Sequence, residues 1–144
     1  MTGYLAIVAC QKYDTHPKYW TYRVPDRVAG HPGTSAQLEA GDLLTGEDLL
    51  YGLMLPSGND ASICLAELVG KIIQKYRKKE QSKTYFETFM SHMNMFSKEL
   101  GLEQEWRNSS GLSYNPNFST GEAITALTIL AMKNPLFRKV VSKK

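Results

Sequence analysis

The sequence lacks the features that define several large classes of protein. No apolar run approaches the roughly 20 residues that a membrane-spanning helix needs. The three histidines are scattered and form no cluster with cysteine at metal-ligand spacing. Glycine-rich phosphate-binding motifs are absent, and so is the G-x-S-x-G pattern of a nucleophile elbow. We therefore expect no transmembrane span, no metal and no cofactor.

The net charge and the number of cysteines are also low. A chain of 144 residues with 42% hydrophobic and 22% charged residues indicates one globular domain, or part of one. The net charge of +3 is too small on its own to argue for a nucleic-acid partner. Cys10 and Cys64 both lie in apolar helical patterns, which favours two buried thiols over a disulfide.

Apolar residues recur at spacings of three and four along most of the chain, which predicts a mainly α-helical fold. We expect helices over residues 3–10, 45–54, 60–73, 86–100 and 119–132, and a short one from 134 onward. Three of these begin with capping patterns, namely Thr45-x-x-Asp48, Ser119-x-x-Glu122 and Asn134-Pro135. Gly101 is a natural stop for the fourth helix. Prolines and glycines break residues 13–44, so a short extended ribbon is expected at about 20–45, with TYRV and SAQLEAGD as its pieces.

The stretch LPSGNDAS, Leu55 to Ser62, lies between two of the expected helices. One interpretation is a plain connection between helices, in which Pro56 and Gly58 end one helix and Asn59 or Asp60 caps the next. The other is a site at which the serine and the asparagine take part in chemistry.

The surrounding residues favour the chemical site, and the two interpretations overlap, because Asn59 or Asp60 can cap the helix while Ser57 faces a cleft. The run LTGEDLLYGLMLPSGNDASICLAE, Leu44 to Glu67, closely resembles the serine D-alanyl-D-alanine carboxypeptidases, the low-molecular-weight penicillin-binding proteins. Further elements of that family follow in the right order: Gly41-Asp42, Phe89, Met93-Asn94, Leu100-Gly101, Asn108 with Gly111-Leu112, and Ser119-Thr120. The resemblance implies the helical subdomain of the β-lactamase and penicillin-binding-protein α+β fold, with the main sheet largely missing.

In this family Ser57-Gly58-Asn59 corresponds to S-x-N, the second of three active-site motifs. The resemblance implies that Ser57 relays a proton and that Asn59 positions the substrate and the lysine base, both projecting from the bend into a groove. The glycine between them would let the loop pass close to substrate.

The other two motifs are absent from the sequence. No serine has a lysine three positions on, and no K-T-G follows; Lys83-Thr84-Tyr85 begins an amphipathic helix rather than a strand. We therefore expect residues 1–144 to form part of a carboxypeptidase domain that lacks its nucleophilic serine, its lysine base and its K-T-G strand. The isolated chain should be inactive.

The expected function is serine-type hydrolysis of peptidoglycan stem peptides ending in D-Ala-D-Ala, through an acyl-enzyme that β-lactams would also form. A catalytically inactive relative that binds a peptide or protein is the alternative. A plain helical interaction domain with mild basic charge, whose partners would be nucleic acid or acidic proteins, is a third. The family acts outside the cytoplasmic membrane, but residues 1–10 show neither the basic start nor the cleavage site of an export signal, so localisation stays open, as does oligomeric state.

Overall fold

The helices lie close to where the periodicity of the sequence places them. The computed structural model describes residues 1–77, 82–102, 104–112 and 117–143. Within these residues the α-helices are α1 Thr2–Lys12, α2 Gly46–Met54, α3 Asn59–Tyr76, α4 Tyr85–Glu99, α5 Gly121–Lys133 and α6 Pro135–Val141, with a 3₁₀ turn, η1, at Pro17–Tyr19. The short strands are β1 Thr21–Arg23, β2 Leu43–Thr45, β3 Gln104–Glu105 and β4 Phe118–Ser119. The expectation of a mainly α fold is confirmed.

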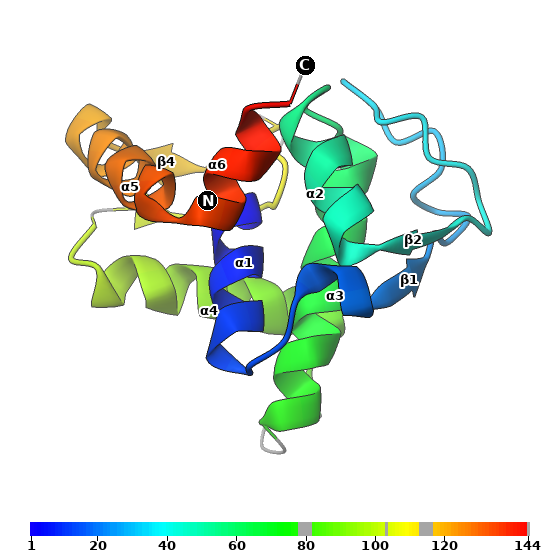
Figure 1. Ribbon diagram of the computed structural model, residues 1–144, viewed down its shortest axis with the longest axis horizontal. Coiled ribbons are helices and arrows are strands. Elements are labelled where there is room, and N and C mark those ends of the chain that lie inside the picture. The colour runs from blue at the N-terminus through cyan, green and yellow to red at the C-terminus, as the bar shows by residue number, and fades with distance from the viewer. Residues whose placement is uncertain (78–81, 103, 113–116, 144) are drawn as a thin grey trace.

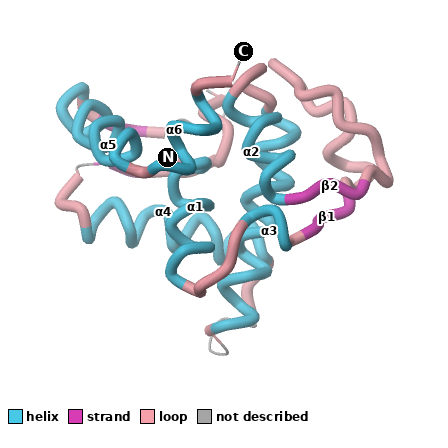
Figure 2. Tube along the Cα trace, viewed as in Figure 1, coloured by secondary structure: helices cyan, strands magenta, loops and turns pink. Residues whose placement is uncertain are grey.

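The extended ribbon is smaller than expected. β1 and β2 pair antiparallel, with Thr21 opposite Thr45 and Arg23 opposite Leu43. The chain between them forms turns and irregular loops at one edge of the molecule (Figure 2). The segment 35–42, expected to contribute an extended piece, holds no strand; Ala36 N and Leu38 N bond to the carboxylate of Asp60, and only the end of the segment, at Gly41 and Asp42, bonds to the backbone of Val24 after β1.

Helix α3 forms the centre of the core, with α1, α2 and α4 packed around it (Figure 1). Its buried residues recur along most of its length because neighbours cover it on several sides. The largest fully buried side chains include Ile7, Leu49, Leu50, Leu65, Leu68, Ile72, Phe89, Met93 and Val140. At Gly70 the backbone of α4 comes so close that a Cβ atom would lie 1.8 Å from the carbonyl oxygen of Tyr85.

Side-chain caps fix most of the helix starts. The expected box at Thr45 and Asp48 is present, and Asn134 caps α6 with Pro135 at its first turn, as predicted. Thr84 and Glu87 form a second complete box, at the start of α4.

Two predicted caps are wrong. At α5 the capping residue is Thr120, not Ser119, since its hydroxyl accepts from Ala123 N. Helix α3 has Gly58 at its cap position and no side-chain cap. Asn59 and Asp60 already lie in the first turn, where their side chains bond to the ribbon instead.

Both cysteines are buried free thiols, as predicted. Burial raises the pKa of Cys10 and of Cys64 to about 12. Asn94, the polar residue within the apolar stripe of α4, holds the following loop, because its amide exchanges two hydrogen bonds of 2.8 Å with the backbone of Trp106. Polar groups that are satisfied in this way can be covered without a large desolvation penalty.

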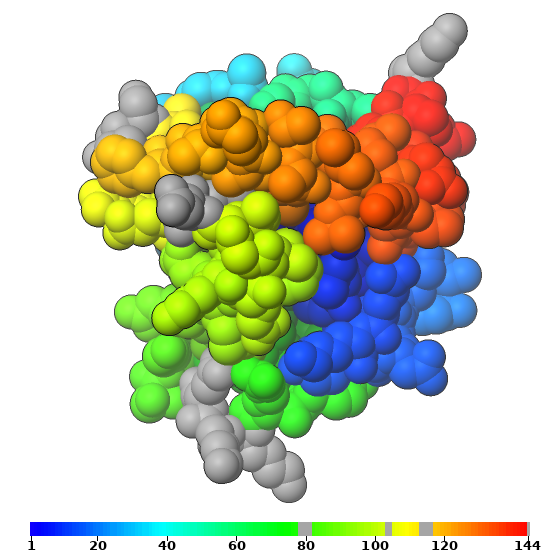
Figure 3. Space-filling model, turned by 90° about the vertical axis from the view of Figure 1, so that its left-hand side faces the viewer, coloured from blue at the N-terminus to red at the C-terminus, as the bar shows by residue number. Residues whose placement is uncertain are grey.

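Helix α5 lies across the end of α4 and beside α1 (Figure 3). Leu127 and Ala131 pack with Tyr4 of α1 in a small second core. On its other sides α5 leaves Ile124, Ile129 and Met132 exposed. Within the described residues, no helix is both long and apolar enough to cross a membrane.

Candidate active site

The bend between α2 and α3 puts Ser57 at the surface. Ser57 is exposed and has φ of +59°, a left-handed conformation that non-glycine residues seldom adopt. Such a backbone costs on the order of 1–3 kcal/mol and persists only where its surroundings impose it. Among the residues that the structure describes, none forms a hydrogen bond with the Ser57 hydroxyl, so this group faces solvent with its donor and acceptor capacity unused.

The strain at Ser57 is held by the ribbon. Thr34 Oγ1 donates a hydrogen bond of 2.5 Å to the carbonyl oxygen of Ser57. Two residues further on, Asn59 N donates to the carbonyl oxygen of Thr34 at 2.8 Å. Thr34 therefore bonds the bend on both sides of Gly58, which fixes the bend in the conformation that turns Ser57 outward.

Gly58 is required for a reason that differs from the expectation. A Cβ atom at this position would lie 2.7 Å from the carbonyl oxygen of Gly52 and 2.8 Å from the backbone nitrogen of Ala36. Both distances are shorter than side chains tolerate. The chain's own backbone therefore excludes a side chain at this position, and the expected close approach to substrate stays a prediction.

Asn59 lies underneath the ribbon rather than beside Ser57 at the surface. It is only 5% exposed, and its Nδ2 donates to the carbonyl oxygen of Pro32 at 3.1 Å. Gly33 packs directly against the amide, and a Cβ atom at Gly33 would meet both Asn59 Nδ2 and the side chain of Leu112. Of the two side chains, Ser57 is therefore exposed and Asn59 is buried, because the segment 32–34 closes over Asn59.

Asp60 is a site residue that the sequence analysis interpreted only as a possible cap. It is 1% exposed, yet its carboxylate accepts four hydrogen bonds. The donors are Ser35 Oγ at 2.7 Å, Ala36 N at 2.9 Å, Leu38 N at 3.1 Å and Ala61 N at 2.8 Å. Burial alone would raise the pKa of Asp60, but these hydrogen bonds outweigh it and lower the pKa.

The N-terminal end of α1 borders a small hollow of about 170 Å³. Its lining comes from three parts of the chain: residues 1–3, residues 53–54, and residues 106, 108–111 and 117. Thr2 Oγ1 donates to the carbonyl oxygen of Ser109 at 2.7 Å, which joins the start of α1 to the loop containing Asn108, Gly111 and Leu112. That loop turns because Asn108 Oδ1 accepts from Gly111 N at 2.6 Å. The N-x-x-GL element noted in the sequence is thus brought next to α1 and, through Leu112, close to Asn59.

One further contact ties these loops to α3. Ser62 Oγ and Ser109 Oγ lie 3.1 Å apart, both buried, and Ser62 Oγ also donates to the carbonyl oxygen of Asn59. Ser62 and Ser109 lie inside the quoted sequence elements but are not among the defined positions of the S-x-N or N-x-x-GL motif, so only the packing of the loop against α3 reveals their contact. Within the described residues no group of histidine, cysteine, aspartate and glutamate could hold a metal ion.

Comparison with known proteins adds to this geometry. The family model described as D-alanyl-D-alanine carboxypeptidase matches residues 1–144. The D-alanyl-D-alanine carboxypeptidase of Streptomyces sp. strain K15 is 38% identical over 120 residues, which cover 83% of this chain and 39% of that protein. The crystal structure of the Streptomyces K15 DD-transpeptidase superposes with a TM-score of 0.75 at 27% identity, over 99% of this chain and 54% of that one.

Penicillin binding protein 6B from Escherichia coli shares the fold, with a TM-score of 0.81 at 22% identity over 99% of this chain and 43% of that one. The present chain therefore spans less than half the length of the K15 carboxypeptidase that it matches in sequence. The expected helical subdomain of the penicillin-binding-protein fold is confirmed.

Proposed function

We propose that this chain, which belongs to the D-alanyl-D-alanine carboxypeptidase family, provides the S-x-N wall of a serine acyl-transfer site that cleaves peptides ending in D-Ala-D-Ala. One observation carries the proposal: within a match that covers the whole chain, the family's S-x-N falls on a strained bend that presents the Ser57 hydroxyl to solvent. Strain of this kind, held by surrounding hydrogen bonds, is a common property of functional sites.

The chemistry assigns one role to each side chain. Acylation of a nucleophilic serine requires a base to remove its proton and an acid to protonate the leaving amine. A hydroxyl both donates and accepts, so Ser57 can pass a proton between a lysine amine and the leaving nitrogen. The amide of Asn59 can donate to the substrate backbone and accept from that lysine at the same time.

Asn59 can act in this way only if the segment 32–34 releases it. Its Nδ2 is bonded to the carbonyl oxygen of Pro32, so a substrate carbonyl would have to replace that acceptor. Exchange of one carbonyl acceptor for another changes little in net hydrogen-bond energy. The ribbon thus occupies the place at Asn59 that we assign to the substrate.

The nucleophile and its base come, on this proposal, from polypeptide outside these 144 residues. The sequence contains no S-x-x-K and no K-T-G, and Ser57 is accordingly given a relay role and not that of nucleophile. The domain assigned to residues 1–144 is then a partial carboxypeptidase domain. The expected β-lactam reactivity belongs to the completed site.

One observation favours the alternative, a catalytically inactive relative that binds a peptide or protein. The coverage of Asn59 by Gly33 and Leu112 is what a chain that no longer uses the amide would show. The two functions differ in what Ser57 does, and that difference can be measured.

A fluorescent penicillin separates them. We expect no covalent labelling of the 144-residue chain, because no serine has a lysine base at the motif spacing. We expect labelling once segments of a family carboxypeptidase carrying S-x-x-K and K-T-G are fused before Met1 and after Lys144. In that fusion Ser57→Ala should lower the acylation rate at least a hundredfold. Thr128→Val, which removes an exposed hydroxyl on α5, is the matched control and should leave it unchanged.

Two outcomes would count against the proposed function. Labelling of the isolated chain would show a nucleophile that the assignment does not contain. If penicillin acylates a folded fusion at the same rate with serine or alanine at position 57, only the binding alternative remains.

A further inference from the structure

A groove runs along one face of α3, starting one turn beyond Asn59. Asn59, Ile63 and Glu67 are spaced by four residues and therefore lie on the same face of the helix. Two hollows follow this face, one of about 330 Å³ and one of about 530 Å³, and Arg27 and Glu67 line both of them. We call the two together the α3 groove.

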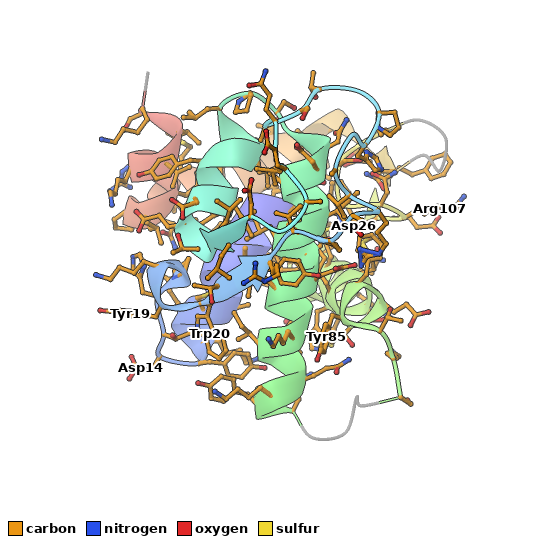
Figure 4. All side chains as sticks on the ribbon, turned by 90° about the vertical axis from the view of Figure 1, so that its right-hand side faces the viewer. Asp14, Tyr19, Trp20, Asp26, Tyr85 and Arg107 are labelled. Carbon is orange, nitrogen blue, oxygen red and sulfur yellow. The ribbon has the colours of Figure 1, made fainter. Side chains whose placement is uncertain are left out.

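The length of the α3 groove matches a short extended peptide. Its floor extends from Ile63 to Gln74, which at about 1.5 Å per helical residue is roughly 16 Å. An extended chain advances about 3.3 Å per residue, so roughly five residues fit. One wall is the ribbon around Arg27, and the other is the start of α4 at Tyr85. In Figure 4 Asp26, next to Arg27, and Tyr85 both lie along α3 on this side of the molecule.

The first hollow is suited to an apolar side chain. Val28, Ile63 and Phe86 contribute its apolar lining, and Ser109 and Ser110 contribute hydroxyl groups. Apolar walls with a few polar groups are the usual composition of a small-ligand pocket, because the former supply burial and the latter fix orientation.

The second hollow has an excess of positive charge. Arg27 and Lys83 both line it, against the single carboxylate of Glu67. That carboxylate, whose side chain is 11% exposed, is already bonded to Arg27 Nη2 and to the hydroxyl of Tyr22. Burial and the hydrogen bond to Glu67 raise the pKa of Tyr22, so this hydroxyl stays protonated and remains a donor.

Both cations keep donors for a ligand. The side chain of Arg27 is 59% exposed, and the structure uses one of the five N–H donors of its guanidinium group. Lys83 Nζ donates to Ser91 Oγ at 3.1 Å, and within the described residues it forms no salt bridge, although the carboxylate of Glu87 attracts it through space. Glu67 balances only one of these two positive charges. A carboxylate placed between Arg27 and Lys83 would neutralise the other.

We propose that the α3 groove binds an extended acidic peptide segment, with an apolar side chain in the first hollow and a carboxylate between Arg27 and Lys83. The identification of this segment as the part of the stem peptide that precedes the scissile bond rests on the proposed function. A chain that enters at Asn59 and follows α3 reaches the apolar hollow first and the cationic one next.

The test uses the intact chain and two peptides without a D-Ala-D-Ala end, acetyl-Leu-Ala-Glu-Ala-amide and its glutamine counterpart. Backbone amide shifts in the NMR spectrum report where each peptide binds. We expect the glutamate peptide to shift residues 27–28, 63–67 and 83–86 and to bind at least threefold more tightly than the glutamine peptide at low salt. The difference should shrink as salt is added, because partly exposed ion pairs are screened.

Lys83→Gln should lower the affinity for the glutamate peptide to that for the glutamine peptide and leave the latter unchanged. Lys98→Gln removes an exposed lysine near the other end of α4 and should change neither. Equal affinities of the wild-type chain for both peptides, or shifts confined to other surfaces, would overturn the proposal.

The outcome is separable from that of the proposed function. Ser57→Ala should leave peptide affinity unchanged, since Ser57 does not line the α3 groove. An inactive fusion would refute the acyl-transfer site while the peptide titration still shows whether the groove binds. An active fusion with no glutamate preference would refute the groove alone.

Discussion

The hydroxyl of Thr34 lies 2.5 Å from the carbonyl oxygen of Ser57, and this hydrogen bond joins the irregular ribbon to the bend between α2 and α3. The two residues are 23 positions apart, so the conformation of the serine is imposed by a distant segment. The orientation of the Ser57 hydroxyl thus depends on the ribbon as much as on its own motif.

Removal of the Thr34 hydroxyl should relax the bend. We expect Thr34→Val to lower the free energy of unfolding by about 1 kcal/mol, the usual value of one hydrogen bond. Thr34→Ser keeps the hydroxyl and should retain most of that stability. Urea unfolding measures both. In the active fusion, Thr34→Val should also slow acylation; equal stability and equal rates for the two variants would show that the hydroxyl does not hold the bend.

Asp60 should make stability depend on acid. Because its pKa is lowered in the folded state, the unfolded chain binds the proton more readily between the two pKa values. The stabilisation is therefore complete above the unfolded value of about 3.9 and is lost as pH falls through the folded value. We expect Asp60→Asn to lower the free energy of unfolding by about 1–3 kcal/mol at pH 6.

The difference between wild type and Asp60→Asn should shrink from pH 5 toward pH 2.5, as followed by urea titrations. Asp14→Asn, at an exposed position, is the control and should alter neither stability nor its pH dependence at this scale. A difference that stays constant over this range would mean that the Asp60 carboxylate is not the titrating group.

Gly58→Ala should disrupt the bend by steric conflict. The added Cβ atom would meet the Gly52 carbonyl oxygen at 2.7 Å, and backbone atoms cannot move aside as a flexible side chain can. Overpacking of this kind costs about 1–3 kcal/mol. Gly121→Ala, where no atom lies within 4 Å, is the matched control and should be neutral or slightly stabilising. Thermal unfolding of the two variants provides the comparison.

Local patterns predicted the elements well, and long-range contacts account for what they missed. The sequence located each of the six α-helices that the structure describes but not the 3₁₀ turn at Pro17–Tyr19, and the box at Thr45 needs only residues within one turn. The cap at Thr120 and the absence of strand in residues 35–42 could not be predicted, because neighbouring segments decide them. A strand over residues 35–42 would lose the hydrogen bonds that this segment makes to Asp60. The sequence alone does not show that these bonds form.

The candidate site shows the same division. The motif around Ser57 identifies the residue, but only the packed structure shows that Asn59 lies beneath Gly33. The α3 groove has no sequence signature at all. Arg27, Glu67 and Lys83 come from three separate segments, and their proximity depends on how the ribbon and α4 pack against α3.

The two thiols should be inert in the native state. Burial raises the pKa of Cys10 and Cys64 to about 12, so at pH 8 about one thiol in ten thousand is ionised. We expect an aromatic disulfide reagent to react with neither on the time scale of its reaction with free cysteine, and with both in 6 M guanidinium. Rapid native labelling of one thiol would show that its surroundings open without global unfolding.

Helix α5 should make the isolated chain prone to self-association. Ile124 is 43% exposed, Ile129 56% and Met132 42%, on a helix that also borders a hollow of about 310 Å³. Exposed apolar side chains of this kind favour association, because burial contributes about 25 cal/mol per Å². We expect light scattering of the wild-type chain to increase with concentration and Ile129→Lys to reduce it without loss of stability. Leu127→Lys places a charge in the small core and should unfold the chain instead. A wild-type chain that stays monomeric at high concentration would show that this surface is too small or too divided to associate.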